Sequence, residues 1–401
     1  MIKNDITLNN TTIKKDNTTF IGGPKSTIHE SSHYKTSSSK SFRGPIPNSY
    51  YYIINEIISG ENNKVFSAVK MTSSGNIDET RYSVKYFSKK WIKEEVLHKL
   101  KFPEERIIKF FESIKKSLND FKQIKNEYIQ TLYDYYDDDD GMYIILEFCD
   151  WTLRDYISMI REPLRNSRAP FEYKIRKFIL HMLHAIYHLH EHNSLSFGGL
   201  LNSSDIMVAE PNDNSGSTIV KFPHPFLANL MTILKIYDNE NFPSHYSPEV
   251  YELFQEDVVL KIIEKKDSFD MGSLLSKINQ NFDMWALGYC LYEILFDNPP
   301  FAFDNLKKVL STLTKDFAYK INPYGISFNS LKIINLCLQY EPQERLQSFL
   351  LNEIIEEFKK ENDAGEEFEN SLKERGLIKG NLQKDDLEKF QLTQIYFDKY
   401  Q

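Results

Sequence analysis

The pattern of apolar and polar positions changes near Tyr50. From there, residues 51–71 (YYIINEIISGENNKVFSAVKM) are rich in β-branched and aromatic residues on both sides of a polar stretch at Gly60–Asn63. This pattern predicts two strands joined by a turn. Residues 79–89 (ETRYSVKYFSK) alternate in the same way and predict another strand, after a turn at Ser73–Asp78.

Three shorter segments follow these strands. Residues 91–101 (WIKEEVLHKLK) carry apolar residues at helical spacing and predict a short helix. Residues 106–113 (RIIKFFES) and 141–148 (GMYIILEF) predict two more strands. We interpret residues 113–140 as an insertion of helical character that ends in four aspartates. Without alternating ligands or a turn glycine, these aspartates favour a solvated loop over a Ca²⁺ site.

The rest of the chain is mainly helical. Residues 152–163 and 170–193 predict two helices, and short β segments at 206–208 and 218–222 precede further helices. A strand-rich part followed by a helix-rich part predicts an α+β fold with two lobes. We place the smaller, β-rich lobe at about 49–147 and the larger helical lobe at about 150–358.

Two terminal segments differ from this central part. Residues 1–48 are rich in Asn, Thr, Ser and Lys and predict a disordered tail, because they have too few large apolar residues to offset chain entropy. Within the tail, residues 31–45 either accept phosphates or are simply flexible. Residues 359–401 mix both charges on a helical pattern and predict a charged C-terminal extension.

Bulk properties narrow the class of protein. The formal net charge of -8 gives no reason to expect nucleic acid as a partner. No apolar run approaches the ~18 residues of a membrane-spanning helix, so we expect no membrane association. Cys149, Cys290 and Cys337 lie far apart in apolar runs and predict buried free thiols in a reducing compartment, which favours the cytoplasm and leaves the nucleus open.

Histidines are concentrated on the helix predicted at 170–193. His184 and His188 have the i, i+4 spacing that can hold a metal ion. No acidic residue or cysteine lies at a matching spacing, and apolar residues already define a core stripe on this helix. We therefore expect no metal site there.

Five segments, in their order along the chain, carry a family resemblance. They are EFCDWTLRDYI (147–157), AIYHLHEHN (185–193), HYSPEVYE (245–252), DMWALGYCLYEILFDNPPF (283–301) and INLCLQYEPQERLQS (334–348). Together they resemble the eukaryotic protein-kinase fold from about Tyr50 to Phe358. The resemblance implies a bilobal α+β fold. It also implies that Glu249 pairs with Arg345 and that Asp283 accepts hydrogen bonds from the catalytic-loop backbone.

The resemblance also implies a nucleotide site in the small lobe. Its candidate residues are Gly60, Val65, Ser83, Lys85, Glu147 and Met207. Only Gly60 remains of three glycines expected in the phosphate loop, and Ile58 does not substitute for glycine. Lys85 is either the nucleotide lysine or a surface lysine at a strand edge. Its helix partner is uncertain, because Glu94 and Glu95 follow too closely.

The catalytic loop of the family aligns with the stretch SFGGLLNSSD, residues 196–205. In the two registers considered, Gly199 or Leu200 occupies the place of the catalytic aspartate. Asp205 matches the metal-binding asparagine of the family, although a surface aspartate that caps a turn is an equal alternative. Neither register supplies a carboxylate to accept the substrate hydroxyl proton.

The second metal position is also changed. His224 lies where the family has the aspartate of its Asp-Phe-Gly motif, and imidazole is a poor substitute because Mg²⁺ prefers hard oxygen ligands. The chain therefore resembles a pseudokinase. The resemblance assigns no catalytic residue, because Gly199, Leu200, Asp205 and His224 are degenerate positions. We expect no metal site, and ATP as the only cofactor to consider, without well-bound Mg²⁺.

A regulatory or scaffolding role with a protein partner, such as another kinase, is the preferred interpretation. The segments 113–140, 250–282 and 359–401 are candidate docking surfaces or plain solvated excursions. The alternatives are an atypical ATP-dependent Ser/Thr kinase that uses Lys85 and Asp205 with His224 as base, and nucleotide binding without transfer.

Overall fold

The computed structural model describes most of the central part of the chain. The described residues are 44–47, 49–59, 63–72, 74, 76–97, 104–161, 168–193, 196–197, 199, 201–210, 218–224, 246–253, 280–301 and 326–360. Residues 254–279 of the candidate docking segment 250–282, residues 361–401 of the extension 359–401 and residues 1–43 of the predicted tail lie outside this set. So do Gly60 and Leu200.

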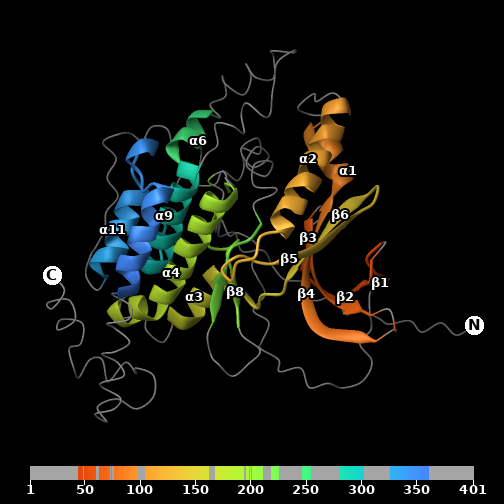
Figure 1. The fold of residues 1–401 in the computed structure, drawn as a ribbon, viewed down its shortest axis with the longest axis horizontal. Helices are drawn as coiled ribbons and strands as arrows, with labels where there is room; N and C mark the ends of the chain where they lie inside the picture. Colours follow the sequence, from red (N-terminus) through yellow and green to blue (C-terminus); the bar gives the residue numbers. More distant parts are fainter. Residues whose placement is uncertain are drawn as a thin grey trace, which may run out of the picture. The chain divides into compact units, whose positions relative to one another are not determined.

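A six-stranded antiparallel sheet forms the first part of the fold (Figure 1). Its strands are β1 (Gly44–Pro45), β2 (Tyr51–Ser59), β3 (Asn63–Met71), β4 (Ile77–Ser88), β5 (Leu132–Asp137) and β6 (Gly141–Glu147). Their order is β1-β2-β3-β4-β6-β5. β1 lies within the predicted tail and Ile46 is buried, so the folded region begins before Tyr50.

The register of the central strands separates two faces of this sheet. Phe66, Val84 and Ile145 are directly paired across β3, β4 and β6 and share an outer cluster. Lys85 pairs with Val65 and with Ile144, whose side chain belongs to the main core. Because paired residues point to the same side, Lys85 lies on the inner face of a central strand. The alternative of a lysine at a strand edge is therefore wrong.

A 19-residue helix, α2 (Glu104–Lys122), lies alongside the inner face of the sheet (Figure 1). The strand predicted at 106–113 is wrong, because this segment is the first half of α2. Its apolar residues Ile107, Ile114 and Leu118 recur at helical spacing and are buried. The supposed insertion at 113–140 therefore contains the second half of α2, a connection and β5. The helix predicted at 91–101 is present as α1 (Lys89–Trp91) and the π-helix η1 (Ile92–Leu97).

The second part of the fold is helical, as predicted. It contains α3 (Leu153–Arg161), α4 (Arg168–Asn193), α6 (Pro248–Leu253), α9 (Gln280–Phe296) and α11 (Phe328–Cys337), the short 3-10 helices η3 (Pro342–Glu344) and η4 (Ser348–Leu350), and a helix at 351–360. α9 is buried over almost its whole length, because the helix itself carries apolar residues on all its faces. The predicted α+β, two-lobed kinase-like fold is confirmed.

A small three-stranded sheet stands beside these helices. It is formed by β7 (Trp151–Thr152), β8 (Met207–Ala209) and β9 (Ile219–Lys221) in sequence order. Just after β9, the Phe222 backbone bonds to the chain between α2 and β5: its N–H donates to the Tyr128 carbonyl, and its carbonyl accepts from the Gln130 N–H. β9 is thus tied directly to the part of the chain that carries the larger sheet.

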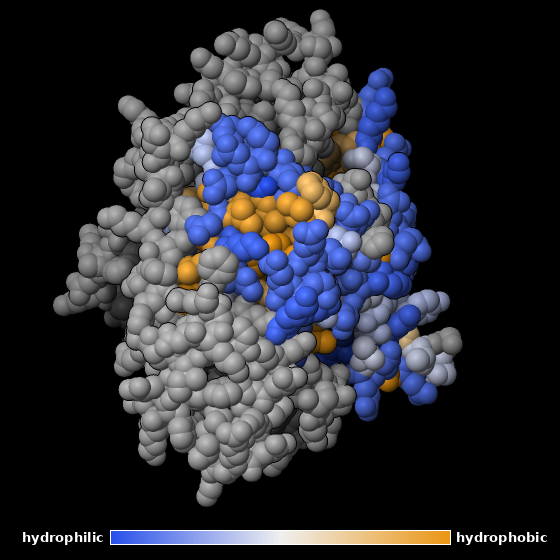
Figure 2. All heavy atoms as spheres, turned by 60° about the vertical axis from the view of Figure 1, so that its left-hand side comes forward, coloured by the Kyte–Doolittle hydropathy of each residue, from blue (hydrophilic) through white to orange (hydrophobic). Residues whose placement is uncertain are grey.

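The surface contains apolar areas as well as charged ones. On the face drawn in Figure 2, hydrophobic side chains gather in one area bordered by hydrophilic side chains. Among the described residues, Met159 and Phe349 are two of the exposed large apolar side chains. All three cysteines are buried and free, which confirms that prediction. None of the described helices combines the length and apolar character needed to cross a membrane.

The contact between α9 and α11 depends on a glycine. A Cβ added to Gly288 would lie 2.6 Å from the Cβ of Cys337 and 2.9 Å from the Cγ of Leu338. Both neighbours are buried, so they have little room to move.

We expect Gly288→Ala to lower the free energy of unfolding by roughly 1–3 kcal/mol, because it overpacks this contact. Helix propensity alone predicts the opposite sign, a gain of about 1 kcal/mol. Urea denaturation followed by circular dichroism distinguishes the two. An unchanged or higher midpoint would show that α11 moves away without cost.

Candidate functional site: a kinase-like catalytic loop held by structural contacts

The loop before β8 is anchored on one buried carboxylate. Asp283, at the start of α9, is fully buried and accepts hydrogen bonds from the backbone N–H groups of Phe197 (2.9 Å) and Gly199 (3.0 Å). Its Oδ2 also lies 3.1 Å from Nε2 of His190, near the end of α4. Asp283 thus holds the loop against two helices, in the contact that the family resemblance implied.

Gly199 occupies its place for a conformational reason. Its φ is +72°, in the left-handed region that side chains disfavour, and an added Cβ would lie 3.2 Å from the Cβ of Phe282. This backbone turn directs the Gly199 N–H toward Asp283. A catalytic side chain at this position would therefore disturb the anchor, whereas glycine maintains it.

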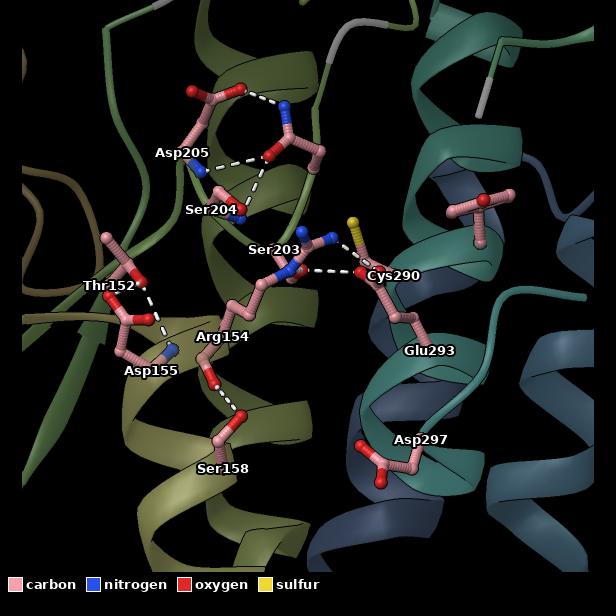
Figure 3. A network of polar contacts seen from close by, with 12 residues as sticks. Thr152, Arg154, Asp155, Ser158, Ser203, Ser204, Asp205, Cys290, Glu293 and Asp297 are labelled. Atoms are coloured by element: carbon pink, nitrogen blue, oxygen red, sulfur yellow. Dashed lines mark hydrogen bonds and ion pairs between the residues drawn. The ribbon is translucent and has the colours of Figure 1, made fainter. Parts of the chain in front are cut away.

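Farther along the loop, a polar network clamps Ser203 (Figure 3). The side chain of Ser203 is buried; its hydroxyl donates to Glu293 at 2.5 Å and accepts from Nε of Arg154 at 3.2 Å. Arg154 also donates to the other oxygen of Glu293 at 2.5 Å. These contacts join α3, the loop and α9, so the clamp holds the loop in one conformation.

Asp205 closes a local turn. The side-chain carbonyl of Asn202 accepts from the N–H groups of Ser204 (2.9 Å) and Asp205 (3.2 Å), and its amide donates to the Asp205 carboxylate (Figure 3). One side of that carboxylate is therefore engaged within the loop itself. This is the geometry of a turn cap, the alternative to a metal ligand.

Lys85 lies half-buried on the inner face of β4. Burial is the main cause that lowers the pKa of its amine, while the negative charge of Asp205 and the thiol of Cys149 oppose this effect. Within the described part of the chain, no residue forms a salt bridge or hydrogen bond with the amine. The lysine–glutamate ion pair of the family, which the sequence left open for Lys85, is therefore not formed by the residues that the structure describes.

The acids of the helix beside Lys85 do not provide this pair. α2, not the segment 91–101, is the long helix against the inner face, and its acids Glu104, Glu105, Glu112 and Asp120 are all exposed. Glu94 is also exposed, and the side chain of Glu95 lies outside the described set. The inner face of α2 instead presents Ile114 and Leu118.

His224 follows β9 and packs against α2. Its ring centroid lies 3.7 Å from that of Phe121, and the imidazole is hydrogen-bonded to the backbone of Ser117. Burial, and then the charge of Lys85, hold the pKa of His224 well below its usual value, whereas the Ser117 bond acts in the opposite direction. The side chain at the expected metal position is thus a neutral ring in a packed contact.

The remaining candidate residues of the nucleotide site that the structure describes lie on β3, β4, β6 and β8. Val65 and Ser83 share the inner face with Lys85, and Met207 begins β8. The carboxylate of Glu147 pairs with Lys221 of β9 at 2.6 Å and also accepts from the Thr131 N–H at 3.1 Å. Glu147 therefore has a structural contact that its sequence position did not reveal.

Mg²⁺ does not fit the residues at this site. It requires several hard oxygen ligands in near-octahedral geometry. Here His224 is engaged with α2, and the Asp205 carboxylate is engaged with Asn202. Throughout the described residues, no group of three His, Cys, Asp or Glu side chains is arranged to hold a metal ion.

Glu249 and Arg345 form a bidentate ion pair that closes the helical part of the fold. One of its two contacts measures 2.7 Å between Nη2 and Oε2. The guanidinium of Arg345, which is buried, also donates to the carbonyls of Gln339 (2.8 Å) and Tyr340 (3.0 Å) and lies over the ring of Trp285. The pair therefore connects α6 to α9 and to the chain after α11.

His181 of α4 provides a further contact between α4 and β9. Its Nδ1 accepts a hydrogen bond from the Val220 N–H at 3.2 Å, and its ring stacks on Tyr128. Burial lowers the pKa of His181 to about 3, and the charges of Lys177 and His184 add to this effect. The sequence showed His181 only as part of a histidine-rich helix, so this role was missed.

The chain is similar to several curated protein kinases. The chain is 22% identical to calcium-dependent protein kinase 5 of Plasmodium falciparum over 267 residues, which are 66% of this chain and 41% of that protein. It is 26% identical to the serine/threonine-protein kinase PLK4 of Nematostella vectensis over 230 residues (56% of this chain, 19% of the relative). It is also 26% identical to PLK4 of Xenopus laevis over 234 residues, which are 56% of this chain and 20% of that protein.

These similarities cover only a part of each relative. The chain spans less than half the length of the curated relatives that it matches. No family model matches the chain.

We expect Arg345→Lys to lower the free energy of unfolding by about 3 kcal/mol. An ammonium cannot form the bidentate contact of a guanidinium, so the carboxylate of Glu249 is left poorly paired. Lys332→Ala is the control: its pair with Glu357 is exposed and contributes no more than about 1 kcal/mol. Urea denaturation measures both. Equal losses in the two variants would contradict the role assigned to Arg345.

The lowered pKa of His181 predicts acid sensitivity. The unfolded chain takes up a proton near pH 6.5, whereas the folded chain resists protonation down to about pH 3. Stability is therefore complete above about pH 6.5 and falls as the pH drops, by up to ~1.4 kcal/mol per pH unit for one proton.

In His181→Asn, the amide oxygen can still accept from Val220 but cannot titrate. We expect a lower stability at pH 7, because the ring stack on Tyr128 is lost, and a flatter dependence on pH between 6.5 and 5. Denaturation curves at several pH values measure the slope. A slope equal to that of the unaltered chain would exclude His181 as its source.

Proposed function

We propose that this chain, which its curated relatives support as a member of the protein-kinase-like superfamily, is a pseudokinase that acts as a regulatory or scaffolding protein in signalling. One observation carries the proposal. His224, at the position where the family holds a metal-binding aspartate, is packed on Phe121 and hydrogen-bonded to Ser117 of α2. A residue used in this way contributes to packing and leaves the transferring phosphate without its metal.

The catalytic loop supports the same interpretation. Gly199 has a left-handed backbone and donates to Asp283, and Ser203 is buried between Arg154 and Glu293. Each of these contacts stabilises the loop, and none of them presents a base to a substrate hydroxyl. Groups that transfer phosphate act as a unit, so losing several of them leaves little beyond binding.

The surroundings of Lys85 add a third line of support. In kinases a glutamate of the neighbouring helix orients this lysine, but the acids of α2 are all exposed. Among the residues that the structure describes, the amine therefore has no acidic partner that would direct it toward a nucleotide phosphate.

We propose that the partner is a protein, such as another kinase, and that nucleic acid and membranes are not partners. The apolar area in Figure 2 and the exposed side chains of Met159 and Phe349 offer surface of the kind that proteins bury on association. A reducing intracellular location agrees with three buried free thiols.

The competing function is an atypical Ser/Thr kinase with His224 as its base. A neutral imidazole suits a base, and His224 is neutral at pH 7. However, its ring lies against Phe121 and is hydrogen-bonded to the backbone of Ser117, so the imidazole is already engaged in contacts with α2. This observation favours the non-catalytic proposal.

We expect that any rise in thermal midpoint with ATP is the same with and without Mg²⁺, because the residues at the site do not supply an oxygen cage for the metal. Thermal-shift titrations of the full chain measure this, with Lys85→Ala as the matched control. A shift that requires Mg²⁺ and disappears in Lys85→Ala would contradict the proposal.

A further inference from the structure

We propose that a row of tyrosines on the outer face of the six-stranded sheet docks an arginine-rich segment of a partner protein. This tyrosine row consists of Tyr86 of β4, Tyr143 of β6 and Tyr136 of β5. The proposal specifies the chemistry of a protein partner, but it does not rest on the loss of phosphate transfer, because the row lies on the face opposite Lys85. Either proposal can fail while the other holds.

The strand register brings the three rings to one side of the sheet. Tyr143 is paired with Tyr86 in one neighbouring strand and with Tyr136 in the other. Paired residues point to the same side. All three side chains pack against the outer cluster, which contains Val84 and Ile145. The core of the sheet therefore supports the row from one side.

The tyrosine row is accessible from solvent. Each of its three side chains is only half-buried. The rings of Tyr86 and Tyr143 contact each other, with centroids 4.9 Å apart and planes tilted by 48°. Nearby, Tyr133 is 40% exposed and its ring contacts Tyr82 of the outer cluster. Aromatic side chains gathered on an accessible surface are typical of protein contact sites.

An acidic turn borders the tyrosine row. The ring of Tyr86 lies directly on Gly141, where an added Cβ would be 2.1 Å from Cε2 of the tyrosine. Gly141 follows the aspartates of the turn between β5 and β6. Burial, and then the charge of Asp138, raise the pKa of Tyr86 and of Tyr143, so the negative field of the turn reaches both rings.

The aspartates of this turn differ in what they contact. Asp137 is neutralised within the chain, because Lys115 lies 2.8 Å and Lys89 lies 3.3 Å from its carboxylate. The next acids, Asp139 and Asp140, are exposed, and no lysine or arginine of the described residues forms an ion pair with either. Negative charge that is not compensated within the described chain therefore lies beside the rings.

The combination of ring faces and carboxylates selects arginine. A guanidinium is always charged and stacks on aromatic faces, and Arg81 already makes this contact with Phe148, 3.8 Å from the ring centroid. Lys64 is paired with Tyr86 on the side away from Tyr143, so the docking position is at the Tyr143 end of the row, next to the turn. The acids of the turn repel nucleic acid and anionic lipid, whereas they complement a basic protein segment.

The test is fluorescence anisotropy of a fluorescein-labelled peptide of four Arg-Ser repeats, titrated with the full chain at 0.15 M salt. We expect saturable binding. In Tyr143→Leu, which removes the ring without changing the charge, we expect about three-fold weaker binding. Tyr143→Phe keeps the ring and should bind as the unaltered chain does. Absence of saturable binding, or equal affinities of the Leu and Phe variants, would overturn the proposal.

A second matched pair separates the turn from the overall negative charge of the chain. Asp140→Asn and Glu353→Gln each remove one exposed carboxylate, and Glu353 lies on the helix at 351–360. We expect Asp140→Asn to weaken binding by about three-fold and Glu353→Gln to leave it unchanged. Equal losses would show a general attraction to an acidic protein and would overturn the proposal. Urea midpoints verify folding; if Tyr143→Leu is unfolded, this comparison of two exposed side chains still decides.

Discussion

The buried carboxylate of Asp283 is the contact on which the geometry of the site depends. It takes two backbone N–H groups from the loop and lies against His190, so α4, the loop and α9 meet at one side chain. A fully buried carboxylate is costly unless its oxygens are satisfied. The loop therefore has to adopt a conformation that delivers its N–H groups to Asp283, and the left-handed Gly199 is what makes that conformation accessible. A glycine at position 199 is thus favoured by the backbone conformation that the anchor requires.

The same principle extends outward from the loop. Ser203 lies between Arg154 and Glu293, Lys221 pairs with Glu147, and His224 packs on Phe121. In each case a polar group lies where the family resemblance suggested chemistry or ligand binding, and its hydrogen-bonding capacity or ring surface is used within the chain. Polar groups satisfied internally in this way stabilise the fold, because buried partners left unpaired would cost free energy. Lys85 is the exception, since it remains unpaired among the described residues.

The sequence predicted the fold well where long patterns were unambiguous. The long helix at 168–193 follows from its apolar stripe, and the alternating strands follow from their β-branched and aromatic residues. The buried helix at 280–296 is apolar on all its faces, and its segment was recognised through the family resemblance. The strand predicted for RIIKFFES (106–113) was wrong. Its β-branched and aromatic residues suggested a strand, although the helical spacing of its apolar residues continues to Leu118. This error concealed α2, whose acids are exposed and do not pair with Lys85. The roles of Gly199, Ser203 and Lys221 depend on contacts between residues far apart in the chain, which no local pattern encodes.

The central claim is that the residues at the positions of the family's catalytic and metal-binding groups stabilise the fold and do not transfer phosphate. Single-turnover transfer, with the protein in excess over radiolabelled ATP and with Mg²⁺ and a protein substrate present, tests it most directly. We expect the unaltered chain to transfer no more label than Lys85→Ala. Transfer that depends on Mg²⁺ and is abolished by Lys85→Ala would contradict this account.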